Sequence, residues 1–395
     1  MSARPIYLDY CATTPVCAEV RTAMLQALGE TFGNPSSLHW AGQAAARLVE
    51  QARAQVAASL ACQPAEVVFT SGATEADNLA LFGTLRQYAP GQAHLITATT
   101  EHHAILHAAQ QLEREGYAVT YVPVDRQGLV DPEAVRRALR PETVLISVML
   151  VNNEVGAIQP VAALGALAHQ HGASLHTDAV QGLGLLDINV DELQADLLSL
   201  SAHKIYGPKG IGALYMRAGT RLKPVNFGGV QEAGWRAGTE NVPGIVGLGA
   251  AVEYTGQHKA AERERLGQLR QTLLDGLRER VPGLLVNGPL AACAPHVLSV
   301  SFPQADGEML LMRLNMAGLA TSMGSACTSK SIEPSHVLTA MGLRPDRARA
   351  SIRFSLGKQN TADEVEFALG LVPETVARLR ELSPLWKKSE LKIQN

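Results

Sequence analysis

Short apolar runs alternate with a helix-like spacing of apolar positions between about residues 37 and 216. Apolar runs of four or five residues bounded by turn residues are typical of buried strands, and apolar residues repeated every three or four positions are typical of helices. The pattern predicts strands over 67–70, 94–97, 119–122, 144–148, 174–177, 196–200 and 213–216. It predicts helices over 74–88, 104–115, 131–139 and 161–171. This alternation indicates βα units that build a mostly parallel sheet, and therefore an α/β protein.

The pattern changes beyond this region. A charged amphipathic helix is predicted over 259–280, and it is followed by strands near 297–302 and 351–354. A last helix is predicted near 362–381. We interpret this part of the chain as a second, smaller α+β domain.

Polar side chains directly follow three of the predicted strands. The first is followed by Ser71-Gly-Ala-Thr-Glu75, another by Asp178-Ala-Val-Gln181 and a third by Ser201-Ala-His-Lys204. Ligands of open α/β sheets bind beyond the carboxyl ends of the strands, so these residues are candidates for a site. The first segment runs from a turn into a helix, whose free N–H groups and positive dipole end attract an anion. The strand ends thus offer an anion cradle, a carboxylate and a lysine.

These residue types match the chemistry of pyridoxal phosphate. A lysine amine can form a Schiff base, and an aspartate can keep a pyridine nitrogen protonated so that the ring withdraws electrons. Lys204 alone could be a surface lysine, and Asp178 alone could be a helix N-cap. Their spacing allows one crossover between parallel strands, so both side chains could reach one ring.

Length, net charge and cysteine content narrow the classes of protein to which the chain can belong. A chain of 395 residues has room for two or three domains, and a net charge of −3 gives no indication of a nucleic-acid partner. The cysteines are odd in number and form no C-x-x-C pair, which favours neither a disulfide framework nor a zinc site: Cys11, Cys17, Cys62, Cys293 and Cys327. Asp9 lies where a secretion signal would need apolar residues, and no apolar run is long enough for a membrane span. We therefore expect a cytoplasmic protein.

Two segments resemble the cofactor segments of the class V aminotransferase-fold cysteine desulfurases: His176-Thr-Asp-Ala-Val-Gln181 and Ser199-Leu-Ser-Ala-His-Lys-Ile-Tyr-Gly-Pro-Lys-Gly-Ile-Gly-Ala-Leu-Tyr215. Shorter matches run nearly end to end, and the resemblance is closest to the IscS/NifS-like branch. The shorter matches are segments 7–15, 32–36, 68–75, 100–102, 151–154, 236–241, 324–329, 351–357 and 382–386.

The resemblance implies the fold of a PLP-dependent transferase, fold type I and aspartate aminotransferase-like. This fold has a mostly parallel central sheet and a smaller α+β domain. We assign 16–256 to the large PLP-binding domain, and 1–15 with 257–395 to the small domain. The small domain carries a catalytic-cysteine loop, about 321–333, that is predicted to be mobile.

The resemblance also implies residue roles. Lys204 bonds the cofactor as a Schiff base, and Asp178 pairs with the ring nitrogen. Gln181 contacts the ring hydroxyl, and His102 stacks on the ring. The implied phosphate ligands are Ala73, Thr74, Ser201, His203 and, from a second subunit, Thr239. This last residue implies a homodimer.

The substrate side of the site is implied in the same way. Asn153 and Arg353 hold the α-carboxylate of the substrate, since the guanidinium fork matches both carboxylate oxygens. Cys327 lies in a run of mostly small residues and attacks the sulfur of L-cysteine after Lys204 has moved the Cα proton. The products are alanine and a persulfide on Cys327, which thiol exchange can pass to an acceptor.

Two residues depart from the family pattern. Met323 stands where the family loop commonly has a serine, and Cys11 stands where Asn, Ser or Ala is usual. Packing of the loop, docking of a partner or turnover could differ because of Met323. The Cys11 thiol could be silent or could be a second oxidisable group near the site.

The sequence therefore predicts a cysteine desulfurase that supplies sulfur to an iron–sulfur scaffold or another acceptor for cluster assembly or thiolation. The nearest rivals are a transaminase or a selenocysteine lyase on the same scaffold, which would not require Cys327. A non-catalytic sulfur-carrier or binding subunit is the rival from another class. We predict no metal, because His103 and His107 are spaced four apart beside Glu101 without an H-E-x-x-H pattern. Lys209 lies in a Gly-Pro-Lys-Gly turn and is predicted to be a solvated side chain.

Overall fold

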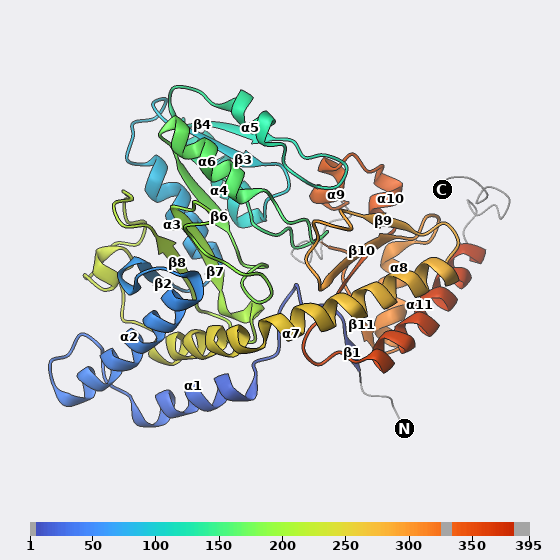
Figure 1. Ribbon diagram of the computed structural model, residues 1–395, viewed down its shortest axis with the longest axis horizontal. Helices are drawn as coiled ribbons and strands as arrows, with labels where there is room; N and C mark the ends of the chain where they lie inside the picture. Colours follow the sequence, from blue (N-terminus) through green and yellow to red (C-terminus); the bar gives the residue numbers. More distant parts are fainter. Residues whose placement is uncertain (1–4, 325–333, 383–395) are drawn as a thin grey trace.

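The computed structural model describes residues 5–324 and 334–382 (Figure 1). Its strands are β1 (Ile6–Tyr7), β2 (Val67–Thr70), β3 (His94–Ala98), β4 (Ala118–Val122), β5 (Thr143–Ser147), β6 (Ser174–Asp178), β7 (Leu197–Ser201), β8 (Gly212–Met216), β9 (Leu285–Asn287), β10 (Val297–Ser301), β11 (Leu319–Ala320) and β12 (Ser351–Ser355). Its α-helices are α1 (Ala18–Glu30), α2 (Trp40–Leu60), α3 (Ala73–Leu85), α4 (His103–Arg114), α5 (Pro132–Ala138), α6 (Val161–His171), α7 (Val242–Arg280), α8 (Gly307–Met316), α9 (His336–Ala340), α10 (Pro345–Arg349) and α11 (Ala362–Leu382). Short 3-10 turns lie at Pro64–Glu66, Ala202–Lys204 and Glu232–Gly234.

The largest sheet has the strand order β2-β8-β7-β6-β5-β3-β4. Strands β3 to β7 pair in parallel, whereas β8 is antiparallel to both β2 and β7. Because β8 is antiparallel to both of its neighbours, β2 runs in the same direction as β7 and β6. The α/β prediction is confirmed, and each predicted strand of this sheet lies within one residue of the observed bounds. The three strand ends singled out in the sequence therefore lie at one edge of the sheet.

Alternate residues of the strands enter two apolar cores. Leu145 of β5 packs into a core with α3 and α4, and its neighbour Ile146 packs into a core with α2, α6 and α7. Successive side chains of a strand point to opposite faces, so a strand buried on both faces must be apolar at nearly every position. Helices therefore cover the sheet on both sides, as Figure 1 shows.

The smaller antiparallel sheet β12-β10-β9 packs with α8 and α11 around a third core. Helix α7 joins the two parts of the molecule: Leu248 contributes to the core of the large sheet, and Leu273 contributes to that of the small sheet. The predicted helix over 259–280 was too short, because α7 already begins at Val242. The predicted boundary after residue 256 falls inside this helix, and the division into two domains stays a prediction.

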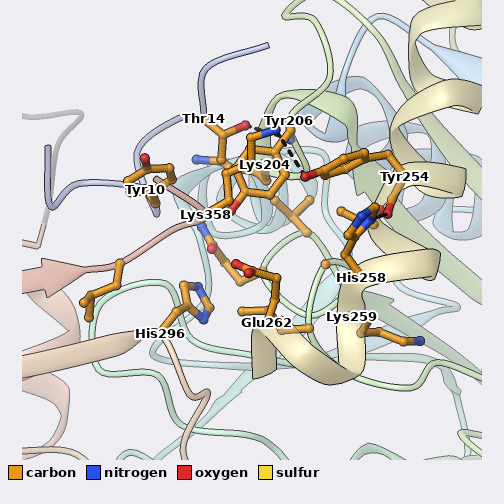
Figure 2. A pocket seen from close by; sticks show the side chains of 16 residues that line it. Tyr10, Thr14, Lys204, Tyr206, Tyr254, His258, Lys259, Glu262, His296 and Lys358 are labelled. Atoms are coloured by element: carbon orange, nitrogen blue, oxygen red, sulfur yellow. Dashed lines mark hydrogen bonds between the residues drawn. The ribbon is translucent and has the colours of Figure 1, made fainter. Parts of the chain in front are cut away.

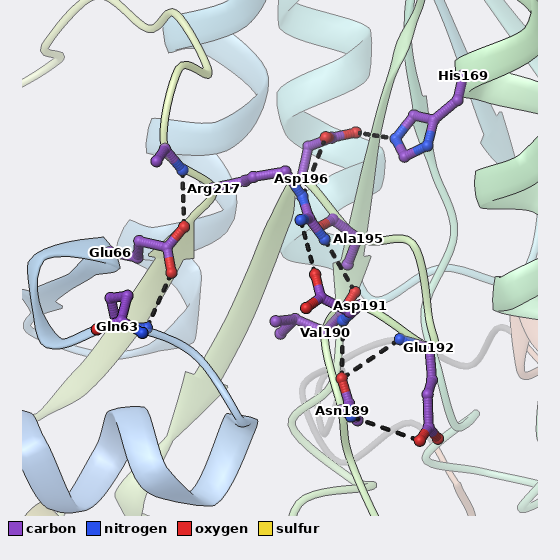
Figure 3. A network of polar contacts seen from close by, with 11 residues as sticks. Gln63, Glu66, His169, Asn189, Val190, Asp191, Glu192, Ala195, Asp196 and Arg217 are labelled. Atoms are coloured by element: carbon purple, nitrogen blue, oxygen red, sulfur yellow. Dashed lines mark hydrogen bonds and ion pairs between the residues drawn. The ribbon is translucent and has the colours of Figure 1, made fainter.

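A polar network closes the amino-terminal edge of the large sheet, opposite the strand ends discussed above (Figure 3). Arg217, just after β8, binds Asp191 at 2.7 Å, and His169 of α6 contacts Asp196 at 2.9 Å. Asp196 also accepts a hydrogen bond from the backbone N–H of Leu175 in β6. These bonds satisfy polar groups where β6, β7 and β8 meet, which leaves the other edge to carry the site. No helix in the described ranges is both long and apolar enough to cross a membrane.

Candidate active site

A cavity of about 590 Å³ opens at the carboxyl-terminal edge of the large sheet. Most of the predicted site residues line it: Ala73, Thr74, His102, Asn153, Asp178, Gln181, Ser201, His203, Lys204 and Arg353. Two do not belong to this set. Thr239 is exposed and does not line the cavity, and Cys327 lies outside the described residues.

Lys204 and Asp178 come from adjacent parallel strands. Asp178 is the last residue of β6, and Lys204 ends the 3-10 turn that follows β7. The Lys204 ammonium donates to the carbonyl oxygens of Cys11 at 2.6 Å and Ala12 at 2.7 Å. Burial lowers the pKa of Lys204, and burial raises the pKa of Asp178 to about 6 although Val180 N–H and the Lys204 charge oppose this. The two groups are therefore a partly desolvated amine and a buried acid in one cavity.

His102 caps the amino terminus of α4, directly after the turn that follows β3. Its Nδ1 accepts a hydrogen bond from the backbone N–H of Ala104 at 3.2 Å, which fixes the orientation of the ring. Burial, followed by the charge of Lys204, lowers the pKa of His102 to about 4. A neutral, oriented imidazole therefore lines the cavity beside Lys204.

The anion cradle predicted after β2 is formed at the start of α3. Gly72 has a φ of 156°, and a Cβ built on it would meet no atom within 4 Å, so the space at the helix terminus is open. Ser201 and His203 face the same cavity from the end of β7. Burial, with the charges of Lys204 and Lys209, lowers the pKa of His203 to about 4, and its Nδ1 lies 3.1 Å from the hydroxyl of Thr13. This end of the cavity offers N–H groups, hydroxyls and a neutral imidazole to an anion.

Arg353 lies at the other end of the cavity on β12. One of its terminal nitrogens donates to Asp9 at 2.7 Å and the other donates to the carbonyl oxygen of Asn153 at 2.8 Å. The backbone of Arg353 also bonds in both directions to Ser322, just before the segment that contains Cys327. The predicted carboxylate-binding pair is thus brought together, and the start of the cysteine segment is anchored to the same strand.

Two buried acids in or near the site, Asp77 and Glu101, received no role from the sequence. Asp77 of α3 lines the cavity, and its Oδ1 lies 3.6 Å from Nε2 of His176. Glu101 accepts the backbone N–H of Met149 through one oxygen, and its other oxygen is buried without a hydrogen-bond partner. Burial, with the charge of Asp178 adding to it, raises the pKa of both acids well above the usual range. The only sequence signals are an acid within the apolar face of α3 and one directly before His102.

Of the two residues that depart from the family pattern, Cys11 is buried and Met323 is half-buried. The Cys11 thiol is 2% exposed and lies 3.5 Å from Nε2 of His296. Burial raises the pKa of Cys11, which disfavours the reactive thiolate form. Met323 packs against the core of the small sheet.

A second, much smaller cavity of about 40 Å³ reaches Lys204 from another direction (Figure 2). It lies between Tyr206 and Tyr254, and the Lys358 ammonium donates to the Tyr254 hydroxyl at 3.2 Å and lies over its ring. This volume suits a few water molecules rather than a cofactor. Within the described residues, no group of three or more His, Cys, Asp or Glu side chains is placed to hold a metal ion.

The chain belongs to the aminotransferase class-V family, whose model matches residues 6–367. It is 44% identical over 390 residues to "Cysteine desulfurase IscS" of Dictyoglomus turgidum, covering 99% of this chain and 98% of that protein. It is 48% identical to the protein of the same name from Methylococcus capsulatus, covering 97% and 95%. Within the class-V family these relatives are cysteine desulfurases of the IscS type.

Solved structures agree with this relationship. A structure named "NIFS-LIKE PROTEIN" superposes with a TM-score of 0.90 at 37% identity, covering 95% of this chain and all of that one. A structure of "SspA in complex with cysteine" superposes with a TM-score of 0.80 at 39% identity, covering 89% and 98%. The predicted fold of a class V aminotransferase is thereby confirmed.

Proposed function

We propose that this protein is a pyridoxal-phosphate-dependent cysteine desulfurase that removes sulfur from L-cysteine and releases L-alanine. One observation carries the proposal: the cavity brings Lys204, Asp178, His102 and Arg353 together in a chain that matches cysteine desulfurases over nearly its whole length. The sulfur is held as a persulfide on Cys327 and is passed to an iron–sulfur scaffold or another acceptor.

The residues of the cavity fit the cofactor. Its volume is in the usual range for small-molecule sites. Asp178 is a buried acid suited to hold the protonated ring nitrogen, and Lys204 would hold the cofactor covalently through its amine. His102 would lie against the ring and Gln181 would contact its hydroxyl group. Ala73, Thr74, Ser201 and His203 would hold the phosphate, with open space above Gly72 to receive it. When bound, pyridoxal phosphate supplies an electron-withdrawing ring that weakens the bonds at the Cα and Cβ of the substrate.

The protein's own groups then have distinct tasks. Burial lowers the pKa of Lys204, so its amine is more easily neutral and can take the proton from the substrate Cα. Arg353 orients the substrate through its carboxylate, with Asn153 beside it. The Cys327 thiolate attacks the substrate sulfur, so that an S–S bond forms as the C–S bond breaks. The electron pair of the broken bond remains with the carbon fragment, which gains a proton at Cβ, regains the Cα proton from Lys204 and leaves as alanine.

The remaining expectations belong to the same proposal. We infer that the protein acts in the cytoplasm as a homodimer and that Thr239 of one subunit completes the phosphate cradle of the other. Its exposure and its absence from the cavity of its own chain support this role. We keep 16–256 as the PLP-binding domain, and 1–15 with 257–395 as the domain that carries the cysteine loop.

The test is to supply the purified protein with L-cysteine and a thiol reductant, and to measure alanine and sulfide in parallel. We expect equal amounts of both. Cys327→Ala should abolish sulfide release and protein persulfide while the visible absorption of the bound cofactor remains, and Cys62→Ala, outside the cavity, should behave like the wild type. Retained turnover in Cys327→Ala would favour a transaminase or a lyase of the same fold. A colourless protein that takes up no pyridoxal phosphate would favour the binding subunit.

A further inference from the structure

Lys209 lies between the two halves of the anion cradle. It belongs to the turn before β8, and the first residue of β8, Gly212, pairs with Thr70 of β2 on one side and with Ser201 of β7 on the other. The cradle segment follows β2, and His203 follows β7. The turn therefore borders both, and Lys209 is exposed yet lines the 590 Å³ cavity together with them.

The other charged groups that line the cavity near this end already have partners. Glu75 is paired with Arg236 at 2.9 Å and also accepts hydrogen bonds from Ser71 N–H and Asn226. The Lys204 ammonium is bound by two carbonyl oxygens. In the described part of the chain, no acid lies within ion-pair distance of Lys209. Its charge is therefore available to a ligand of the cavity.

The rest of the cradle has no full positive charge. Thr74 and Ser201 are neutral, and His203 is a neutral imidazole at neutral pH because burial lowers its pKa to about 4. The helix terminus contributes only a partial charge, roughly half an elementary charge. A phosphate monoester carries about −1.5 to −2 at pH 7. The charge of the phosphate is thus not balanced by the residues that the family resemblance assigned to it.

We propose that Lys209 is a further cofactor-binding residue, whose ammonium balances the phosphate charge and draws the anion toward the cradle. The assignment rests on the proposed pyridoxal-phosphate function. Because Lys209 is exposed, its effect should be moderate and should weaken as salt screens it. Its effect should also be absent for a ligand that lacks the phosphate.

The experiment compares pyridoxal phosphate with pyridoxal, which has the same ring and aldehyde without the phosphate. The full chain is freed of cofactor, and the dissociation constant of each ligand is measured by absorbance titration at low and high salt. In Lys209→Met we expect the dissociation constant for pyridoxal phosphate to rise about three- to tenfold at low salt, and by less at high salt. The constant for pyridoxal should not change. Lys209→Arg should keep the wild-type affinity for both ligands, and Lys223→Met, an exposed lysine away from the cavity, is the matched control.

The possible outcomes distinguish a failure of the Lys209 assignment from a failure of the proposed function. Wild-type affinity of Lys209→Met for pyridoxal phosphate would overturn the role of Lys209 and leave the function intact. An equal loss for both ligands would also overturn it, since that result indicates a damaged site rather than a missing charge. Failure of the wild-type chain to bind pyridoxal phosphate would overturn the proposed function, and this assignment with it.

Discussion

At the scale of single residues, His176 shows how burial holds a side chain in one protonation state next to the site. It precedes Asp178 by two positions on β6, so both side chains point to the same face of the sheet. Its Nδ1 lies 2.8 Å from the hydroxyl of Ser147, and its Nε2 lies 3.0 Å from that of Ser199. Burial lowers its pKa to about 3. The ring therefore stays neutral beneath the carboxylate.

This neutral histidine predicts a pH dependence of stability. The folded-state pKa lies below the ordinary value of 6.5, so between these two values the unfolded chain binds the proton and the folded chain does not. The free energy of unfolding contributed by His176 should fall as the pH drops below 6.5, by up to about 1.4 kcal/mol per pH unit.

Replacement of the imidazole should remove this contribution. The measurement is urea denaturation at about pH 7, 6 and 5. At pH 7, His176→Gln should be less stable than the wild type, because the buried imidazole and its contacts with Ser147 and Ser199 are lost. The difference between the two proteins should shrink as the pH falls. Parallel stability curves would show that His176 already binds its proton in the folded chain.

At the scale of elements, a strained segment lies between β8 and α7. Glu232 and Ala233 have φ values of 47° and 53°, a conformation that costs energy for residues other than glycine. Arg53 of α2 donates to both carboxylate oxygens of Glu232, at 2.8 and 2.9 Å, and Phe69 N–H donates to the same carboxylate. This buried pair holds the segment that leads to Thr239 against β2.

Loss of this carboxylate should be costly. Glu232→Ala leaves the Arg53 guanidinium largely buried without its main partner, so we expect a loss of about 3–5 kcal/mol in the free energy of unfolding. Glu50 is the matched control, because it contacts the same Arg53 at 3.0 Å but is exposed to solvent. Glu50→Ala should change stability by no more than about 1 kcal/mol. Similar losses in both variants, measured by chemical denaturation, would contradict the special role of Glu232.

At the scale of the whole molecule, large apolar side chains are exposed on α1 and on the segment that enters α2. They are Leu25, Leu28, Phe32, Leu38 and Trp40. The rings of Phe32 and Trp40 pack edge to face with centroids 6.0 Å apart, although both remain exposed. Neighbouring exposed apolar residues of this size are typical of an interaction surface. We assign this surface to the homodimer proposed above.

The assignment predicts a particle of twice the chain mass in light scattering. The double variant Leu38→Glu with Trp40→Glu should shift the protein toward monomer, because charges would have to be buried in the interface. It should also weaken pyridoxal-phosphate binding, because Thr239 would no longer reach the other subunit. Leu290→Glu, at an exposed apolar residue elsewhere, is the control and should remain a dimer. A monomeric wild type, or a double variant that stays dimeric, would contradict the interface.

Much of the fold follows from local periodicity. The bounds of β2 and α6 were predicted to the residue, because an apolar run or an amphipathic turn reports its own secondary structure. The start of α7 was missed because glycine disfavours helix. The structure gives a reason for these glycines: a Cβ on Gly247 would come within 2.9 Å of Met24, and one on Gly249 within 2.8 Å of Ala52. The glycines permit close packing of α7 on α1 and α2.

The sequence by itself determined the residue types of the site and their order along the chain. A lysine, an acid and a glycine turn after three strands are local features, and the same segments carry the family resemblance. Only the tertiary structure decided which other residues join them. Asp77 and Lys209 reach the cavity because β8 runs antiparallel between β2 and β7 and because α3 covers that face of the sheet. Strand order and direction arise from packing between distant segments, and no local pattern encodes them.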